Sequence, residues 1–304
     1  MIRGILSTVY KFNNMKKIII LVISVHFAVF GQEISQSKLS PPRRFEHKDV
    51  TGKVFQHDFD SKILNNSRKI FVWIPEGYDL NKNKYPLLVV HDGGVVFYSK
   101  NGGFGKKNKR KNESLPKPGW NLDETVHELI QSKKIKPIIM VGVGVSNAKN
   151  RAFEYVPTRN GVNFGKALIE ELIPEIEKSY RINAQDIGTL GSCAGGLITL
   201  YLGWERNDVF TRAACLSPGI IHRDQNYFEV LKKAKVPKNL QLAIVNGRDD
   251  FDSRLQPGVD KFIEYVNEID FPKENILYWV DQQGSHSPRS WSHQAKDILQ
   301  WMYQ

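Results

Sequence analysis

The chain has 304 residues, of which 41% are hydrophobic, 25% charged and 11% aromatic. This composition is typical of a soluble globular protein and argues against a disordered or membrane-spanning chain. The length is sufficient for one large α/β domain with a sizeable core. Two cysteines are too few for a disulfide framework. The formal net charge of +11 raises the question of anionic partners.

The first 31 residues predict a signal peptide. Lys16 and Lys17 precede a short apolar run that begins at Ile18, and Gly31 is a small residue suited to cleavage. The run is shorter than the roughly 20 apolar residues that span a bilayer, so we expect no stable membrane insertion. Met15, directly before the lysines, is an alternative start. The mature protein is therefore expected to be exported, either to the periplasm or out of the cell.

The positive charge is unevenly distributed. Residues 1–31 hold four cations and no acid, so their removal lowers the net charge from +11 to +7. A glycine- and asparagine-rich stretch that reads as a loop contains Lys106, Lys107, Lys109, Arg110 and Lys111. Such a run is usually a solvated loop, and the alternative is an electrostatic guide for anionic substrates such as acidic glycans. Nucleic acid is not an expected partner, because no base-stacking motif accompanies the charge.

The hydrophobic pattern predicts the fold. Residues 32–48 are polar and are expected to form a linker into a single domain over residues 49–304. Alternating residues in 50–58 and 69–74 predict an antiparallel hairpin with one solvated face. Short continuous apolar runs, as in strands covered on both faces, follow at 87–90, 138–143, 187–190, 242–245 and 276–280. Helical periodicities separate these runs, so the predicted fold is α/β with a mostly parallel, doubly wound sheet.

The segment 186–196 is the most informative stretch, because it reads as strand, sharp turn and helix. Within it, Gly191-x-Cys193-x-Gly195 fits a nucleophile elbow, in which flanking glycines permit a tight turn that raises the central side chain above the sheet. Ala194 begins the following helix, where its N–H and the helix dipole can stabilise an oxyanion.

Five further motifs accompany the elbow: Pro75-Glu-Gly-Tyr78, Leu87-Leu-Val-Val-His-Asp-Gly-Gly94, Arg151-x-x-Glu154-Tyr-x-Pro157, Ser217-Pro218 and Gly284-Ser-His286. Together they make residues 50–304 resemble the α/β-hydrolase esterases that include enterochelin esterases, feruloyl esterases and esterase D, with secreted mycolyltransferases as more distant relatives. In that family the elbow reads Gly-x-Ser-x-Gly-Gly. Cys193 therefore stands where the family has its nucleophilic serine, and Ser192 stands at the variable position.

The resemblance also points to an acid and a base. Hydrolases of this fold order nucleophile, acid and histidine along the chain. The acid falls at the end of the Asn-Gly-Arg-Asp-Asp motif, which is Asp250, with Asp249 and Asp252 left open as alternatives. His286, in a Gly-Ser-His loop after the last predicted strand, suits the base. His293 competes with it but falls in a predicted terminal helix.

Other site residues follow from the resemblance alone. It implies that the backbone N–H groups of Ala194 and Gly94 form the oxyanion hole, and that His91 is structural. It further implies that Arg151 and Glu154 line the substrate site, with a plain salt bridge between them as the alternative. No metal and no organic cofactor are expected.

A thiol beside a histidine at a helix N-terminus has a pKa below the roughly 8.5 of free cysteine. We therefore expect an exported carboxylic-ester hydrolase with a Cys193–His286–Asp250 triad and a thioester intermediate. Its expected substrates are siderophore esters, feruloyl or acetyl esters of glycans, or similar acyl esters. An acyltransferase of the same fold and a catalytically inactive ligand- or glycan-binding protein are the alternatives. Cys215 is expected to be a buried free thiol.

Overall fold

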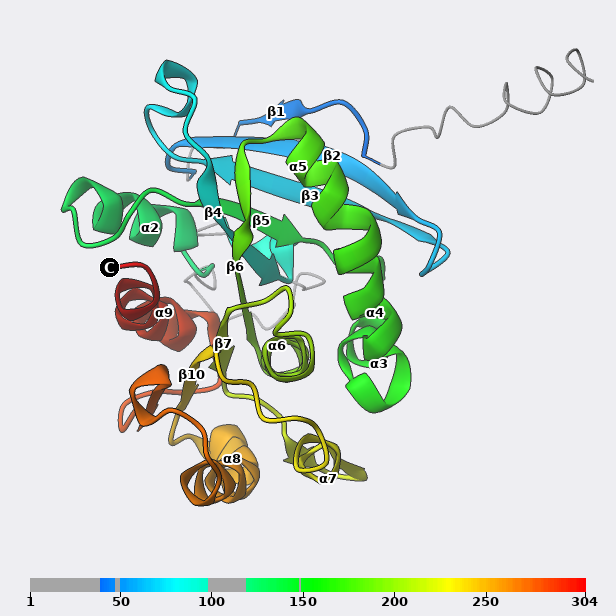
Figure 1. Cartoon of the computed structure of the whole chain (residues 1–304), viewed down its shortest axis with the longest axis vertical. Coiled ribbons are helices and arrows are strands. Elements are labelled where there is room, and N and C mark those ends of the chain that lie inside the picture. Colours follow the sequence, from blue (N-terminus) through cyan, green and yellow to red (C-terminus); the bar gives the residue numbers. More distant parts are fainter. Residues whose placement is uncertain (1–38, 47–49, 98–118, 148) are drawn as a thin grey trace, which may run out of the picture. The chain divides into compact units, whose positions relative to one another are not determined.

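One sheet of nine strands organises the residues that the computed structural model describes, which are 39–46, 50–97, 119–147 and 149–304 (Figure 1). The predicted signal peptide and the basic run at 106–111 lie outside these residues. The strand order is β1-β2-β3-β5-β4-β6-β7-β10-β11. The bounds of these strands are β1 Arg43–Phe45, β2 Lys53–Ser61, β3 Asn66–Ile74, β4 Tyr85–His91, β5 Ile139–Val143, β6 Ile182–Ser192, β7 Arg212–Leu216, β10 Gln241–Asn246 and β11 Ile276–Val280. A separate small hairpin pairs β8 (Ile221–His222) with β9 (Gln225–Asn226).

The sheet has an antiparallel part and a parallel part. β2 and β3 form the predicted hairpin, with Lys53 opposite Ile74 and Ser61 opposite Asn66. β1 pairs antiparallel with β2, and β3 pairs antiparallel with β5. From β5 to β11 every neighbouring pair is parallel. The predicted α/β fold, with a mostly parallel sheet and an antiparallel N-terminal hairpin, is confirmed.

Part of the predicted linker belongs to the sheet. β1 lies within residues 32–48 and pairs with β2 in the register Arg43 opposite Gln56. Leu39 forms an isolated bridge with Phe59, and both side chains are buried. The folded unit therefore begins before residue 49. Cations on β1 are exposed, as is usual on an edge strand, and this polarity concealed the strand in the sequence.

Helices cover both faces of the sheet. Successive side chains of a strand point to opposite faces, so Leu87 and Val89 of β4 join one core while Leu88 and Val90 join the other. Figure 1 shows α2 (Leu122–Gln131) and α9 (Pro288–Tyr303) against one face. The core of the other face includes residues of α3 (Arg151–Tyr155), α4 (Val162–Ala167), α5 (Ile173–Ser179), α6 (Ala194–Glu205), α7 (Phe228–Leu231) and α8 (Asp250–Glu268).

Short helical turns complete the elements: η1 Tyr78–Leu80, η2 Gly93–Val95, η3 Pro157–Gly161, η4 Leu168–Leu172 and η5 Lys273–Asn275. In the described part of the chain, no helix combines the length and the apolar character that a membrane crossing requires.

The helix that follows the elbow is buried almost completely. Ten of the 12 residues of α6 are buried, which is typical of a helix that is apolar on all sides and lies inside a protein. A Cβ added at Gly203 would lie 2.6 Å from the Cβ of Ala213 in β7, so helix and strand approach closely. This packing fixes α6 against the sheet and so holds the turn that precedes it.

Candidate active site

The turn between β6 and α6 places Cys193 at the C-terminal end of a central strand. Its backbone angles are φ 58° and ψ −121°. A non-glycine residue in such a region costs on the order of 1–3 kcal/mol and persists only where its surroundings enforce it. Here the Cys193 N–H donates to the carbonyl of Leu216 at 2.9 Å, and the Leu197 N–H donates to the Cys193 carbonyl at 3.0 Å. The conformation matches a nucleophile elbow.

Glycines make this turn sterically possible. A Cβ at Gly191 would lie 2.4 Å from the carbonyl oxygen of Gly195, closer than any real Cβ contact. Ser192 is buried, and its carbonyl accepts a hydrogen bond from Arg151 at 3.3 Å. Cys193, by contrast, lines an open pocket. The turn thus presents Cys193 and turns Ser192 into the fold.

His286 links Cys193 to a carboxylate. Its Nδ1 lies 2.7 Å from Oδ1 of Asp252, and its ring also hydrogen-bonds the Cys193 thiol. The rings of Phe251 and Trp291 pack against the imidazole, with centroids 4.4 Å and 5.0 Å from that of His286. The turn before α6, the first turn of α8 and the loop before α9 thus each supply one member of a chain of hydrogen bonds.

The carboxylate beside His286 is Asp252, so the prediction of Asp250 is corrected by two residues. Asp250 is the first residue of α8, and Asp252 lies in the first turn of the same helix. Asp252 is fully buried. Its Oδ2 accepts hydrogen bonds from the hydroxyl of Ser217 at 3.1 Å and the N–H of Gly247 at 3.0 Å. These donors hold the carboxylate in place beside the imidazole.

Asp249 has a different role from Asp252. Its Oδ1 accepts the N–H of Asp252 at 2.9 Å and so caps α8. Its Oδ2 accepts the backbone N–H of His286 at 2.7 Å. One side chain thus joins the start of α8 to the loop that carries the histidine. His293, the competing base, is exposed on α9 and makes no such link.

The electrostatics of the site favour opposite charges on Cys193 and His286. Burial by itself would raise the pKa of the Cys193 thiol. The hydrogen bond to His286, the positive charges of His286 and Arg151, and the Ala194 N–H instead hold that pKa below its ordinary value. Burial would lower the pKa of His286, but hydrogen bonds to Asp252 and Cys193 raise it to about 9. Together these shifts favour a thiolate–imidazolium pair.

The loop after β4 lies against the elbow. Asp92 accepts two hydrogen bonds from Arg151, from Nε and Nη2, both at 2.6 Å. Gly94 is exposed, and a Cβ added there would meet nothing within 4 Å, so its backbone borders open space. The N–H of Ala194 is directed at the sulfur of Cys193. The assignment of Gly94 and Ala194 to an oxyanion hole stays a prediction.

The side chains of Arg151 and Glu154, predicted to line one site, have different surroundings. Arg151 lines the pocket beside Cys193. Glu154 is only 2% exposed, so its predicted contact with substrate is corrected. A buried carboxylate requires compensating partners, and those of Glu154 are Arg68 at 2.9 Å, Asn66 at 3.1 Å and Ser146 at 3.1 Å. The two motif residues therefore belong to two different ion pairs, and the salt bridge between them that the sequence allowed is not formed.

His91 is a structural residue. It is fully buried, and burial together with the charge of Arg151 lowers its pKa to about 3, so the ring is neutral. Its Nε2 lies 3.1 Å from the hydroxyl of Thr189. In the described part of the chain, no three His, Cys, Asp or Glu side chains gather in a way that could hold a metal ion.

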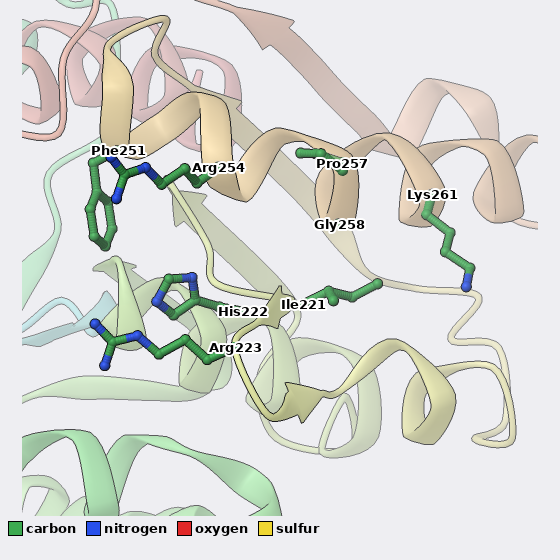
Figure 2. A pocket seen from close by; sticks show the side chains of 8 residues that line it. All are labelled: Ile221, His222, Arg223, Phe251, Arg254, Pro257, Gly258 and Lys261. Carbon is green, nitrogen blue, oxygen red and sulfur yellow. The ribbon is translucent and has the colours of Figure 1, made fainter.

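A pocket of about 330 Å³ opens beside Cys193. Apolar side chains, among them Leu197 and Phe251, form part of its wall, and three arginines line it as well, namely Arg151, Arg159 and Arg223. A second pocket of about 600 Å³ shares His222, Arg223 and Phe251 with the first (Figure 2). The site thus combines a small cavity at the thiol with an adjoining groove.

Sequence comparisons relate the chain to esterases. A family model described as Putative esterase matches residues 61–302. The protein named endo-1,4-beta-xylanase/feruloyl esterase, from Xylanibacter ruminicola, is 26% identical over 219 residues. That match covers 66% of this chain and 28% of the relative, so this chain spans less than a third of that longer protein.

Solved structures share the fold. The BES protein from Bacillus cereus superposes with a TM-score of 0.63 at 17% identity, covering 86% of this chain and 98% of that one. The enterobactin esterase from Shigella flexneri gives a TM-score of 0.62 at 19% identity, covering 90% and 61%. At these identities the likeness establishes the fold.

Proposed function

The chain belongs to the Putative esterase family, and we propose that it is a carboxylic-ester hydrolase that acts through Cys193, His286 and Asp252 by way of a thioester. The proposal rests above all on one observation, the hydrogen-bonded chain from Cys193 through His286 to Asp252 at the strained elbow. The three groups fit the roles of nucleophile, acid–base and orienting carboxylate.

Acylation begins from the thiolate–imidazolium pair. The Cys193 sulfur attacks the ester carbonyl carbon, a C–S bond forms, and the carbonyl oxygen becomes an oxyanion. The N–H groups of Ala194 and Gly94 are the proposed donors to that oxyanion. When the C–O bond breaks, His286 gives its proton to the departing alkoxide. The alcohol leaves, and the acyl group remains on the sulfur as a thioester.

Deacylation returns the site to its starting state. Neutral His286 takes a proton from water as the water oxygen attacks the thioester carbonyl, so the imidazolium forms again. The oxyanion collapses, the C–S bond breaks, and the Cys193 thiolate leaves with the electron pair. The acid is released. Asp252 keeps Nδ1 of His286 protonated throughout, which directs Nε2 toward the reacting atoms.

Arg151 contributes through its charge. Two hydrogen bonds to Asp92 fix the guanidinium, and its positive charge helps to lower the pKa of Cys193. Because the thiolate is then partly stabilised before substrate arrives, less is demanded of His286 as a base than in a serine enzyme. We assign Arg151 to tuning of the nucleophile and to lining the pocket.

The substrate class and the location are also part of the proposal. The pocket of about 330 Å³ is large enough for an aromatic or short acyl group. Feruloyl or acetyl esters of glycans and siderophore esters are the proposed substrates, in keeping with the names of the relatives.

Export rests on the lysine pair, the apolar run and Gly31 in the first 31 residues. N-terminal sequencing of protein from the culture medium and periplasm, with Gln32 as the expected first residue, tests it.

Ester hydrolysis by matched variants tests the mechanism. Wild-type protein is expected to hydrolyse 4-nitrophenyl acetate and methyl ferulate, Cys193→Ala to lose that turnover, and Ser192→Ala to keep most of it. Hydrolysis by Cys193→Ala at the wild-type rate would show that another group is the nucleophile.

A further inference from the structure

The pocket at Cys193 continues into a groove between the β8–β9 hairpin and α8. A Cβ at Gly258 would lie 2.8 Å from the backbone nitrogen of Ile221, so this glycine lets β8 pack directly on the helix. A groove of about 600 Å³ is lined by residues of both elements. Because it shares His222 and Phe251 with the pocket at Cys193, a substrate in one can extend into the other.

Cationic side chains gather at the end of the groove that adjoins Cys193. Figure 2 shows Phe251 and Arg254 from α8 at the same end as His222 and Arg223 from the hairpin, with Lys261 at the other end. The rings of His222 and Phe251 are 5.6 Å apart. The charges of Arg223 and Arg254 both contribute to lowering the pKa of His222, after the larger effect of burial. Arg223, Arg254 and His222 thus line the same groove.

Two of these cations lack a compensating charge. Lys261 lies 3.9 Å from Glu229, and Arg159, in the pocket at Cys193, lies 3.7 Å from Asp224. Within the described ranges, neither Arg223 nor Arg254 has an acidic partner within ion-pair distance. Both arginines are exposed to solvent, so each is accessible to an anion that enters the groove. Guanidinium groups are well suited to bind carboxylates.

We infer that Arg223 and Arg254 bind a carboxylate carried by the ester substrate, so that the enzyme prefers anionic esters. This inference rests on the proposed function, since it assigns the groove to the substrate of Cys193. Phe251 supplies an apolar surface between the reacting carbonyl and the two guanidinium groups. A neutral ester of the same size would gain the apolar contact without the charge pairing.

Matched ester pairs test the inference. In the first pair the carboxylate is on the acyl side, mono-4-nitrophenyl glutarate against 4-nitrophenyl pentanoate. In the second pair it is on the alcohol side, 4-carboxyphenyl butanoate against 4-methylphenyl butanoate. We expect wild-type kcat/KM to favour the anionic member of at least one pair by about tenfold, as one charged hydrogen-bonded contact provides. The double variant Arg223→Gln/Arg254→Gln is expected to reduce that preference to near one.

A second double variant controls for net charge. Arg43→Gln/Arg44→Gln removes the same two charges from β1 at the far edge of the sheet and is expected to keep the preference. Equal wild-type kcat/KM within both pairs, or a preference that survives the loss of Arg223 and Arg254, would overturn the inference.

Binding separates this inference from the proposed function. Calorimetry on Cys193→Ala with glutarate and 4-hydroxybenzoate measures anion binding without turnover. If no ester is hydrolysed, the proposed function fails. Weaker binding after the further loss of Arg223 and Arg254 would then still support the carboxylate site, and unchanged binding would overturn it.

Discussion

The two cysteines meet opposite environments, one within β7 and the other just past the end of the neighbouring strand β6. Cys215 lies within β7, opposite Gly191 of β6, and burial raises its pKa well above the ordinary value of a thiol. Cys193 lies two residues beyond Gly191, where the chain leaves the sheet, and the hydrogen bond to His286 and the charges of His286 and Arg151 lower its pKa against the effect of burial. Both thiols are free. Position relative to the end of the strand, and not residue type, therefore decides which cysteine can act as a nucleophile.

The largest expected effect comes from breaking the hydrogen-bonded chain that joins Cys193 through His286 to Asp252. Asp252→Asn should lower kcat by about two to four orders of magnitude with little change in KM, because the amide no longer fixes the imidazole tautomer or stabilises the imidazolium. Steady-state kinetics on 4-nitrophenyl acetate measures this. Asp250→Asn is the matched control and should keep most of the activity. The opposite outcome for the two variants would show that the catalytic carboxylate is Asp250 after all.

Alkylation compares the two thiols directly. Iodoacetamide followed by peptide mapping should modify Cys193 about a hundredfold faster than Cys215, because only the thiolate reacts and only Cys193 combines a lowered pKa with an accessible sulfur. The lowered pKa of Cys193 should keep its reaction fast below about pH 8.5, the ordinary thiol value. In His286→Ala the rate should fall as pH drops through that value. Preferential labelling of Cys215 would contradict the assignment.

The pKa of His286 is expected to limit ester hydrolysis at high pH. The pKa of His286 is raised to about 9, so the imidazolium is present below that pH and is lost as pH rises through it. Acylation needs that proton for the leaving alkoxide. We therefore expect kcat/KM to decline above about pH 9, about tenfold for each further unit. A rate that keeps rising to pH 10.5 would mean that His286 does not act as the acid.

Replacing Cys193 by serine exchanges the sulfur of the proposed nucleophile for oxygen. A site adapted to the larger sulfur should place its oxyanion donors too far back for oxygen, so Cys193→Ser should be slower than wild type by about tenfold or more. The same ester assay measures it, with circular dichroism to verify folding. Faster turnover by Cys193→Ser would identify the natural protein as a disabled serine esterase and favour the ligand-binding alternative.

The smallest effect is expected at the other cysteine. Cys215 is a fully buried small side chain, and Cys215→Ala removes only its sulfur. Loss of about 1 kcal/mol in the free energy of unfolding is expected, with kcat unchanged, as measured by urea denaturation and ester hydrolysis. A large loss of activity in this variant, at full folding, would show that reactivity is not confined to the elbow.

The strands on either side of the elbow differ in how well the sequence reveals them. Runs of β-branched and leucine residues indicated five of the parallel strands, and Ile276–Val280 agrees in both of its ends. β7 was not picked out, because Ala213 and Ala214 give little strand signal. β1 was missed because its exposed arginines read as linker. Both short strands are stabilised by pairing with neighbours that a local pattern does not contain.

The candidate site shows the same division between local and distant information. Cys193 and His286 were identified because glycine-rich motifs mark them in the sequence. Asp252 was only an alternative, because the choice among three nearby carboxylates depends on the point at which α8 begins. No sequence motif indicates the two arginines of the groove. Arg223 and Arg254 are far apart in sequence, and only the packing of β8 on α8 brings them to the same groove.

Intact-protein mass spectrometry tests the central claim most directly. Rapid quenching in acid after mixing with 4-nitrophenyl acetate should reveal one added acetyl group that decays as substrate is consumed, located on Cys193 by peptide mapping. Cys193→Ala should show no such adduct, and Asp252→Asn should show slower formation. An adduct on another residue, or ester turnover without any adduct on Cys193, would contradict the proposed thioester mechanism.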